Sequence, residues 1–353
     1  MQPDVDSSSF RLTEFSKGAG CGCKISPKAL HEIINESIVS PEGDLLVGNS
    51  AGDDAAVVDL KNGTVLISST DFFMPVVDDA FSFGKIAAAN AISDIYAMGG
   101  KPLVAVAILG WPETIPPSEA RKVMAGGREI CKAAGIALAG GHSIESTEPF
   151  FGLAVNGLIQ IENLKKNDTA KAGDFIFLTK PIGIGILSTA QKRKAITEED
   201  ASFMIDELSK LNTIGMSLAK IKEVTAMTDV TGFGIAGHLS EMAAGSGLTA
   251  EINYQQVPIY EKSKEYLKQR IVPDATYRNW NSYGDKISIE KSIDFMEAFS
   301  LLPDPQTNGG LLFSVKPEGI EKVKSLLIEN GLKDFSNPIG HFIEKQEKLI
   351  LVK

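Results

Sequence analysis

Aspartates occur in or beside apolar segments at four places in this 353-residue chain. They are Asp53 and Asp54 in AGDDAAV, Asp71 in STDFFMP, Asp94 in NAISDIYAMGG and Asp229 in AMTDVTGFG. A buried carboxylate without a partner is costly, and these segments contain no lysine or arginine close enough in sequence to pair with them. Any fold of this chain must therefore bring partners to these side chains.

Magnesium is the partner that best fits this set of carboxylates. Mg²⁺ prefers oxygen ligands and commonly joins one or two carboxylates to nucleotide phosphates. Several aspartates can hold more than one ion, which would neutralise a triphosphate and the charge that develops during phosphoryl transfer. The alternative is that each aspartate caps a helix or closes a turn, since Asp favours both positions. One residue alone does not decide between the two, but the whole set favours the metal site.

Asp94 belongs to a predicted helix over Phe83–Met98 that is apolar on almost every side. Asn90, Ser93 and Asp94 are three and four residues apart, so they share one narrow stripe on its surface. A polar stripe on an otherwise buried helix indicates a site rather than a solvated face.

Strands and helices are mixed in both halves of the chain, which predicts an α+β fold with two domains. The polar stretch 162–173 is the predicted connection. Strands are predicted over 64–69, 102–109, 136–139, 151–159, 175–179 and 348–352, and helices over 26–39, 83–98, 118–134, 234–244, 317–330 and most of 200–222. The strand 102–109 is almost wholly apolar, so we expect it to be buried on both faces or to lie at an interface.

The segment GAGCGCK, Gly18 to Lys24, combines three glycines with two thiols and an ammonium group. Glycines allow the backbone to approach a ligand closely. The Lys24 ammonium favours the nucleophilic thiolate of Cys21 or Cys23, or it pairs with a phosphate oxygen. The alternative is a flexible linker with incidental thiols. Too few cysteine and histidine ligands are present for zinc, and the lysine spacing does not match a Walker A loop.

Three glycine-rich segments are predicted turns that could face a ligand. AGGHS, Ala139 to Ser143, follows a short strand, and His142 in it is either a ligand contact or a satisfied turn histidine. In TGFGIAGH, Gly232 and Gly234 precede a helix, a natural anion position, whereas His238 is expected to pack inside that helix. DPQTNGG, Asp304 to Gly310, is a tight turn before an apolar strand, and Cys131 is expected in the core.

The overall charge excludes some classes of function. The net charge is −10 and the pI is about 5.1, which disfavours binding to nucleic acid or to an anionic membrane. The longest notable apolar stretch, Leu103 to Leu109, is far shorter than the ~20 residues of a spanning helix. Three cysteines and no secretory signal predict free thiols in a reducing compartment, the cytoplasm.

Taken in order, the motifs of this chain resemble those of the selenophosphate synthetase family, within the ATP-binding superfamily related to aminoimidazole ribonucleotide synthetase. They are GAGCGCKISP, LLVGNSAGDDAAV, STDFFMPVVDD, AAANAISDIYAMGGKP, AILGWP, GIALAGGHSIE, FGLAVNGL, LTKPIGIGIL, AMTDVTGFGIAGHLSEM and DPQTNGGLL. The match runs from about residue 11 to about residue 315, and CGCK together with the aspartate motifs is its most specific part.

The resemblance implies that ATP, selenide and water give selenophosphate, AMP and phosphate, and that the product supplies selenium for selenocysteine and selenouridine synthesis. Cys21 and Lys24 match catalytic positions. Magnesium ligands, more than one ion being expected, match Asp54, Asp94 and Asp229. Nucleotide contacts match Lys24, Ala51, Gly52, Asp53, Asp71, Asp94, Gly141, His142 and Ser143. Potassium is a further candidate cofactor.

The implied architecture is a homodimer whose N-terminal domains form a shared β-barrel, with selenide as substrate and a selenium-delivery protein as a candidate partner. We expect a flexible glycine-rich lid and helix over 1–48, an α+β domain that binds ATP and magnesium over 49–161, and a C-terminal α+β domain over 172–353. The lid would bring Cys21 over the phosphates.

The chain departs from the family pattern at two positions. Lys17 stands where many members have histidine, and Asn308 where serine is common. The first would change the charge near the thiol, and the second is tolerable in a turn. The sequence leaves three other functions open: a different kinase or ligase of the same superfamily, a redox protein that uses Cys21 and Cys23, or a nucleotide-binding module without catalysis.

Overall fold

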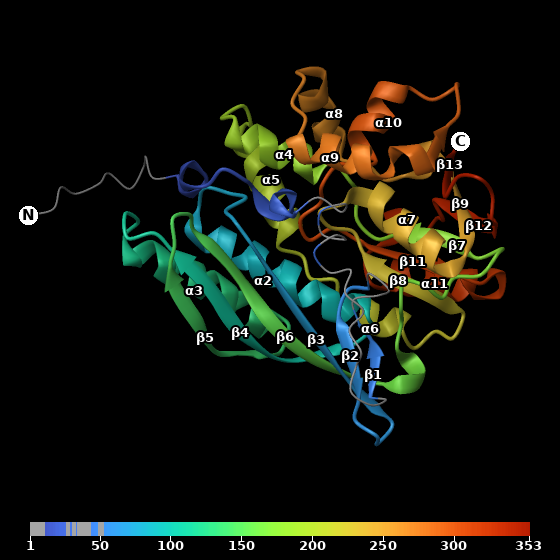
Figure 1. Ribbon diagram of the computed structural model, residues 1–353, viewed down its shortest axis with the longest axis horizontal. Helices are drawn as coiled ribbons and strands as arrows, with labels where there is room; N and C mark the ends of the chain where they lie inside the picture. The colour runs from blue at the N-terminus through green and yellow to red at the C-terminus, as the bar shows by residue number, and fades with distance from the viewer. Residues whose placement is uncertain (1–10, 26–28, 30–32, 34–43, 49–52) are drawn as a thin grey trace, which may run out of the picture.

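A computed structural model describes residues 11–25, 29, 33, 44–48 and 53–353. It is a mixed α+β structure built on two β-sheets, one from each half of the chain (Figure 1). The predicted fold class is therefore confirmed at the level of two mixed α+β halves. Within the described residues, no helix combines the length and the apolar character that crossing a membrane requires.

The first sheet contains six strands in the order β1-β2-β3-β6-β4-β5. Their bounds are Leu45–Val47 (β1), Ala56–Asp59 (β2), Thr64–Phe73 (β3), Lys101–Trp111 (β4), Ala137–Glu145 (β5) and Phe150–Gln160 (β6). All neighbours are antiparallel except β4 and β5, which are parallel and joined through a helix. This crossover leaves β5 at the edge of the sheet.

Two helices cover one face of this sheet: α2, Ala80–Ala97, and α3, Pro117–Ala133. Asp79 caps α2 by accepting a hydrogen bond from the Ser82 N–H at 2.7 Å. The helices cross at glycine positions, where no side chain keeps the two backbones apart. A Cβ on Gly126 would lie only 2.0 Å from the Phe81 carbonyl oxygen. Small residues thus bring α2 and α3 into backbone contact.

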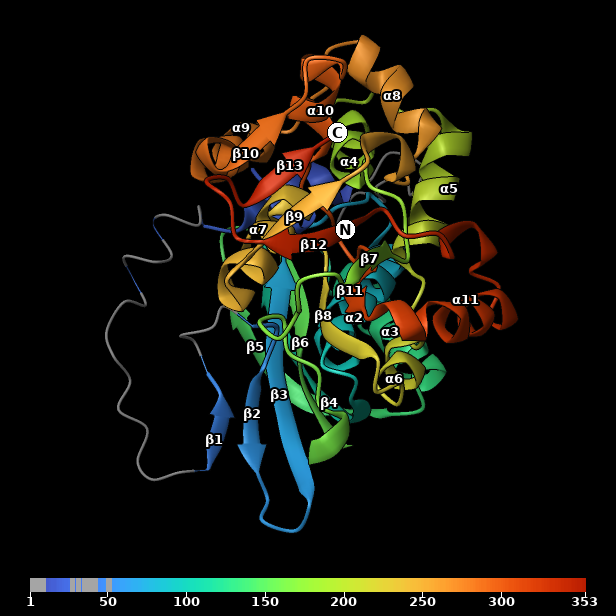
Figure 2. The ribbon, with the colours of Figure 1, turned by 90° about the vertical axis from the view of Figure 1, so that its right-hand side faces the viewer.

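The second sheet contains seven strands in the order β10-β13-β9-β12-β7-β11-β8 (Figure 2). The strands are Phe175–Leu178 (β7), Val224–Asp229 (β8), Leu248–Ile252 (β9), Ile287–Ile289 (β10), Leu311–Val315 (β11), Gly340–Glu344 (β12) and Ile350–Val352 (β13). The helices of this half are Ile184–Lys192 (α4), Glu198–Leu208 (α5), Gly215–Leu218 (α6), Gly234–Ser246 (α7), Glu261–Lys268 (α8), Asp274–Tyr283 (α9), Phe295–Leu301 (α10) and Ile320–Glu329 (α11).

Helix α2 links the two halves, because it packs on β3 and β6 of the first sheet and also contacts β8 of the second. Residues 11–25 lie against both. They form the 3₁₀ turns η1, Leu12–Phe15, and η2, Gly20–Cys23, and η2 contacts β3 and α9. Residues 11–25 are thus held beside the junction of the two halves.

Most predicted elements are confirmed with small shifts of their ends, including β3, α2, α3, β6, β7, α7, α11 and β13. One detail of the first half was wrong. The AGGHS segment is not a turn, because it continues β5 as an extended strand. Of the two alternatives for β4, burial on both faces within one chain is excluded, since Leu103 and Val106 are exposed, and a place at an interface stays a prediction.

In the second half, the helical stretch over 200–222 is two helices, α5 and α6, with an irregular break between them. The predicted connection, 162–173, is not a free linker. Lys165 in it is buried and donates to the Ile221 and Val224 carbonyls at 3.3 and 2.7 Å. The predicted helix over 26–39 lies outside the described residues apart from positions 29 and 33.

Candidate functional site

Three of the predicted aspartates converge where the two halves meet. Asp54 precedes β2, Asp94 lies on α2, and Asp229 ends β8. One carboxylate oxygen from each residue lies within 4.8 Å of the other two. This group joins residues 175 positions apart in sequence, and it is the arrangement that the apolar surroundings of these aspartates predicted.

Hydroxyl groups orient each of these carboxylates. The Ser69 hydroxyl on β3 donates to Asp94 Oδ2, the Ser93 hydroxyl donates to Asp229 Oδ2 at 2.5 Å, and the Thr228 hydroxyl donates to Asp54 Oδ1 at 2.7 Å. Asp54 Oδ2 is buried and accepts no hydrogen bond from any described residue, and the same holds for Asp53 Oδ2. A buried, unpaired carboxylate oxygen needs a cation or a proton.

The like charges of this group make it unstable without a counter-ion. Burial raises the pKa of the Asp54 and Asp94 carboxyls well above their usual range, and the neighbouring carboxylates add to the effect. Burial also raises the pKa of Asp229, to about 6, although the Ser93 hydrogen bond opposes it. A divalent cation would remove this repulsion, and a hard cation such as Mg²⁺ takes this donor set. The residues present therefore fit a magnesium ion.

The Cys21 thiol lies beside this group and is buried. Its backbone N–H donates to the Thr307 hydroxyl oxygen at 3.1 Å, and its thiol donates to Asn90 Oδ1 at 3.3 Å. The Asn308 N–H donates to the same Asn90 oxygen at 2.6 Å, while the Asn90 amide donates to Asp71. The polar stripe of α2 therefore connects the thiol segment, the DPQTNGG turn and β3.

Lys24 favours the thiolate of Cys21, as predicted, but two stronger effects oppose it. Burial and the Asp71 carboxylate raise the pKa of the Cys21 thiol well above its usual range. Desolvation acts to lower the pKa of Lys24 itself, but Asp71, Asp94 and Asp229 outweigh it and raise that pKa, so the ammonium stays charged.

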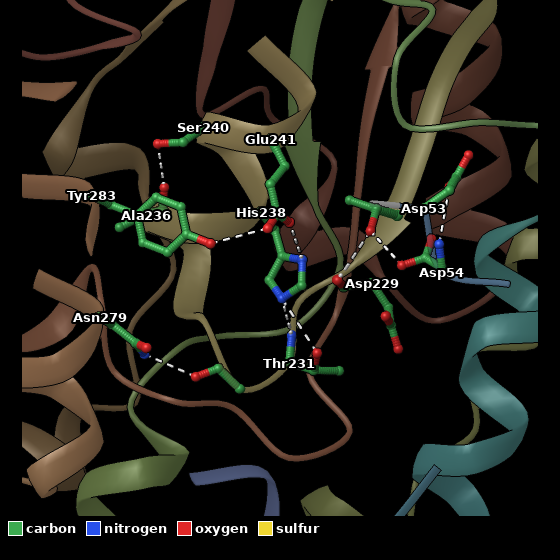
Figure 3. A network of polar contacts seen from close by, with 12 residues as sticks. Asp53, Asp54, Asp229, Thr231, Ala236, His238, Ser240, Glu241, Asn279 and Tyr283 are labelled. Atoms are coloured by element: carbon green, nitrogen blue, oxygen red, sulfur yellow. Dashed lines mark hydrogen bonds and ion pairs between the residues drawn. The ribbon is translucent and has the colours of Figure 1, made fainter. Parts of the chain in front are cut away.

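A histidine network holds the loop that faces this segment (Figure 3). His238 Nε2 on α7 accepts from the Thr231 N–H at 3.1 Å, and its Nδ1 lies 3.4 Å from a Glu241 carboxylate oxygen. Burial lowers the pKa of His238 to about 3, so the ring is neutral. The Tyr283 hydroxyl donates to Glu241 at 3.0 Å.

This network fixes the position of Gly232, whose carbonyl also accepts from the Asn279 amide at 2.8 Å. A Cβ on Gly232 would lie 2.6 Å from the Cys21 carbonyl oxygen, so only glycine allows this approach. The sequence predicted packing for His238 and did not reveal this role. Its spacing of seven residues from Thr231, across the start of a helix, is the signal that could have revealed it.

The other predicted contact residues are spread more widely. Gly141, His142 and Ser143 lie on β5 and are exposed. Asp53 accepts a hydrogen bond from the Asp54 N–H at 3.1 Å, whereas Ala51 and Gly52 lie outside the described residues. Cys131 is buried, as predicted.

Lys180 is a further residue whose role the sequence did not reveal. It is buried, and its ammonium group donates to the carbonyls of Asn308 and Lys210 at 2.9 and 2.8 Å. It therefore holds the turn that contacts Asn90.

Comparisons with known proteins agree with this arrangement. Residues 52–159 match the family model for AIR synthase related protein, N-terminal domain, and residues 171–352 match the one for the C-terminal domain. A selenide, water dikinase of Photorhabdus laumondii is 50% identical over 98% of this chain and 99% of its own. One of Shewanella sp. (strain MR-4) is 54% identical over 90% of both chains.

Among solved structures, hydrogenase maturation protein HypE in complex with ATP aligns with a TM-score of 0.64 at 18% identity, over 85% of this chain and 84% of that chain. At this identity the likeness shows a common fold only. The two domain matches and the full-length relatives show more: this chain belongs to the selenide, water dikinase family of AIR synthase related proteins.

Proposed function

We propose that this protein uses ATP, selenide and water to make selenophosphate, releasing AMP and phosphate. The observation that carries the proposal is the convergence of Asp54, Asp94 and Asp229 beside the buried thiol of Cys21 and the ammonium of Lys24. The names of relatives that match almost the whole chain support it.

Asp54, Asp94 and Asp229 would hold magnesium, more than one ion being expected, and the ions would neutralise the phosphates and the charge that develops during transfer. The chain's own contribution is to orient and space these carboxylates through Ser69, Ser93 and Thr228, whose hydrogen bonds also act to lower their pKa values. For the nucleotide we propose contacts from Lys24, Ala51, Gly52, Asp53, Asp71, Asp94, Gly141, His142 and Ser143.

Lys24 and Cys21 have different tasks in this proposal. The Lys24 ammonium, charged at neutral pH, places a cation beside the phosphates. Cys21 receives the selenium nucleophile, and Thr307 and Asn90 hold its backbone and thiol in place. Hydroselenide is already a good nucleophile, so positioning and charge neutralisation contribute more than a strong base would.

We also propose a cytoplasmic homodimer in which the N-terminal sheets of two chains meet. Exposed apolar side chains on the outer face of the first sheet support the dimer, and the free thiols of Cys21 and Cys131 support a reducing compartment. The shared barrel, the lid over 1–48, the domains 49–161 and 172–353, the potassium ion and the selenium-delivery protein stay predictions.

The decisive assay follows AMP formed from ATP with and without selenide, with phosphorus NMR to identify the product. We expect AMP and selenophosphate only when selenide is present. Cys21→Ser should abolish selenophosphate formation while ATP still binds, and Cys131→Ser, at a core position, should remain active. AMP formation that does not depend on selenide would point to another kinase of the superfamily, and thiol–disulfide turnover without ATP to a redox protein.

The metal site has its own test, because Asp94→Asn removes one negative ligand and keeps the shape of the side chain. We expect magnesium-dependent nucleotide binding, measured by calorimetry, to weaken roughly tenfold or more. Asp206→Asn on the exposed face of α5 is the matched control and should leave the affinity unchanged. Equal affinities for both variants would exclude Asp94 from the metal site.

A further inference from the structure

A cavity of about 320 Å³ is lined in part by the Cys21 segment and by none of the three aspartates. Its walls come from the segment itself, from the ends of α4 and α9, and from the DPQTNGG turn. Ala19 and Gly22, on either side of Cys21, line it, and so does Thr307, whose hydroxyl accepts from the Cys21 N–H at 3.1 Å. Residues that flank or contact Cys21 thus form part of the wall of this cavity.

The charges around this cavity are the opposite of those at the metal site. Lys17, Lys192, Arg193 and Arg278 line it, and Asp274 is the only carboxylate among the described residues that form its walls. This cationic surface occurs in a chain with a net charge of −10. Cations gathered in a concave site attract small anions and raise their local concentration.

The cationic groups divide into an anchor and a set that faces the cavity. The Lys192 ammonium donates to the Ser16, Lys17 and Gly18 carbonyls at 2.8, 2.5 and 2.7 Å, which uses its three N–H groups. The Arg278 guanidinium donates to the Gly22 carbonyl at 2.9 Å and has further N–H donors. Lys17, Arg193 and Arg278 are exposed and can contact a bound anion.

We propose that this cavity binds the hydroselenide anion and is the path by which it reaches Cys21; this rests on the proposed function. From the metal side, an anion would meet the carboxylates of Asp71, Asp94 and Asp229 and the phosphates of ATP. From the cavity side, it meets cations. Arg278 can bind the anion through its further N–H donors while it holds the Gly22 carbonyl, which places the anion beside the residue that follows Cys21.

The test compares alkylation of Cys21 by iodoacetate, an anion, and by iodoacetamide, which is neutral, with each site quantified by mass spectrometry. The test variant is Lys17→Gln/Arg193→Gln/Arg278→Gln. Lys268→Gln at the end of α8 is the control. In the triple variant, we expect the alkylation of Cys21 by iodoacetate to slow roughly tenfold relative to its alkylation by iodoacetamide. The iodoacetamide rate at Cys21 shows whether the substitutions make the segment more open to any reagent. The alkylation rate of Cys131, which is in the core, shows whether the whole protein unfolds more often.

Hydroselenide should protect Cys21 from iodoacetate in the wild-type protein at lower concentrations than in the triple variant. In the selenide-dependent assay, the triple variant should raise the KM for selenide and leave the KM for ATP unchanged. An iodoacetate-to-iodoacetamide ratio that is the same in the wild type, the triple variant and the control would overturn the proposal. That ratio needs no turnover, so it separates failure of this proposal from failure of the proposed function.

Discussion

The protonation state of Cys21 depends on two opposing groups of neighbours. Lys24 lies three residues away and favours the thiolate, whereas burial and the Asp71 carboxylate favour the thiol. Burial has the largest effect, and Asp71, linked to the thiol through Asn90, has the next. The resting enzyme therefore holds a neutral thiol, which becomes nucleophilic only when its surroundings change.

Replacing Asp71 with asparagine tests this balance. Because Asp71 raises the pKa of Cys21, Asp71→Asn should lower that pKa and move the alkylation profile of Cys21 to lower pH. At pH 8 we expect alkylation by iodoacetamide to be about threefold faster or more, because more thiolate is present. Quenched time courses of Cys21 alkylation, taken at pH values from 7 to 10, measure this profile.

Cys131 provides an internal reference for this experiment, since burial alone raises the pKa of its thiol, to about 11. Its profile should not move. An unchanged Cys21 rate in Asp71→Asn, or a rise that Cys131 shares, would contradict the role assigned to Asp71.

The identities of the main site residues could be predicted from the sequence, but their environments could not. Aspartates in apolar segments needed partners, which grouped Asp53, Asp54, Asp71, Asp94 and Asp229, and only the family resemblance singled out Asp54, Asp94 and Asp229. The direction in which the pKa of the Cys21 thiol shifts could not be predicted, because it depends on burial and on a carboxylate 50 residues away in sequence. The roles of His238 and Lys180 escaped prediction for the same reason: their partners are set by the tertiary fold.

At the level of elements, α2 determines the geometry of the site. Its apolar sides pack on the first sheet and on α3, and its polar stripe contacts Cys21, Asp71 and Asp229 through Asn90 and Ser93. Any change that moves α2 away from α3 would therefore also move the groups that hold the Cys21 thiol and the Asp229 carboxylate.

Gly126→Ala should cause such a movement. The added methyl would lie 2.0 Å from the Phe81 carbonyl oxygen, a distance that real contacts do not reach, so the helices must separate. Alanine favours a helix over glycine by about 1 kcal/mol, but overpacking costs more. We expect a net loss of about 1–3 kcal/mol in the free energy of unfolding, measured by urea denaturation.

Arg128→Ala, at an exposed position two residues further along α3, is the matched control and should change the stability by less than about 0.5 kcal/mol. Equal stabilities for the two variants would mean that the helices can adjust without cost. If Gly126→Ala loses selenide-dependent activity under conditions where the variant is still fully folded, the effect would lie at the polar stripe.

The sequence predicted the long helices and strands well, because α2 is apolar on almost every side and α3 has one continuous apolar face. It failed at β5, where Gly140 and Gly141 suggested a turn. Both adopt positive φ values, 156° and 151°, that keep the chain extended, and pairing with β4 continues past them. No element was predicted over 254–303, where α8, α9, β10 and α10 are short and less apolar.

At the scale of the whole molecule, the residues that the structure describes leave an apolar surface of the first sheet exposed. On the outer face of the first sheet, Phe72, Leu103, Val106 and Ile144 are 49%, 56%, 39% and 51% exposed. They come from β3, β4 and β5. In the sheet, β4 and β5 are adjacent, and β6 lies between β3 and β4. Helices α2 and α3 cover only the opposite face. An apolar patch of this kind on an otherwise acidic protein indicates an interface.

We therefore expect the wild-type protein to have about twice the 37.8 kDa chain mass in light scattering, because this face pairs with its copy and buries those side chains. The variant Leu103→Glu/Val106→Glu places two charges at the centre of the patch, where desolvation and mutual repulsion oppose pairing. It should be monomeric at micromolar concentrations. Ile328→Glu, also exposed but on α11, is the control and should remain dimeric. A monomeric wild type, or a double variant that dimerises as tightly, would contradict the assignment of this face.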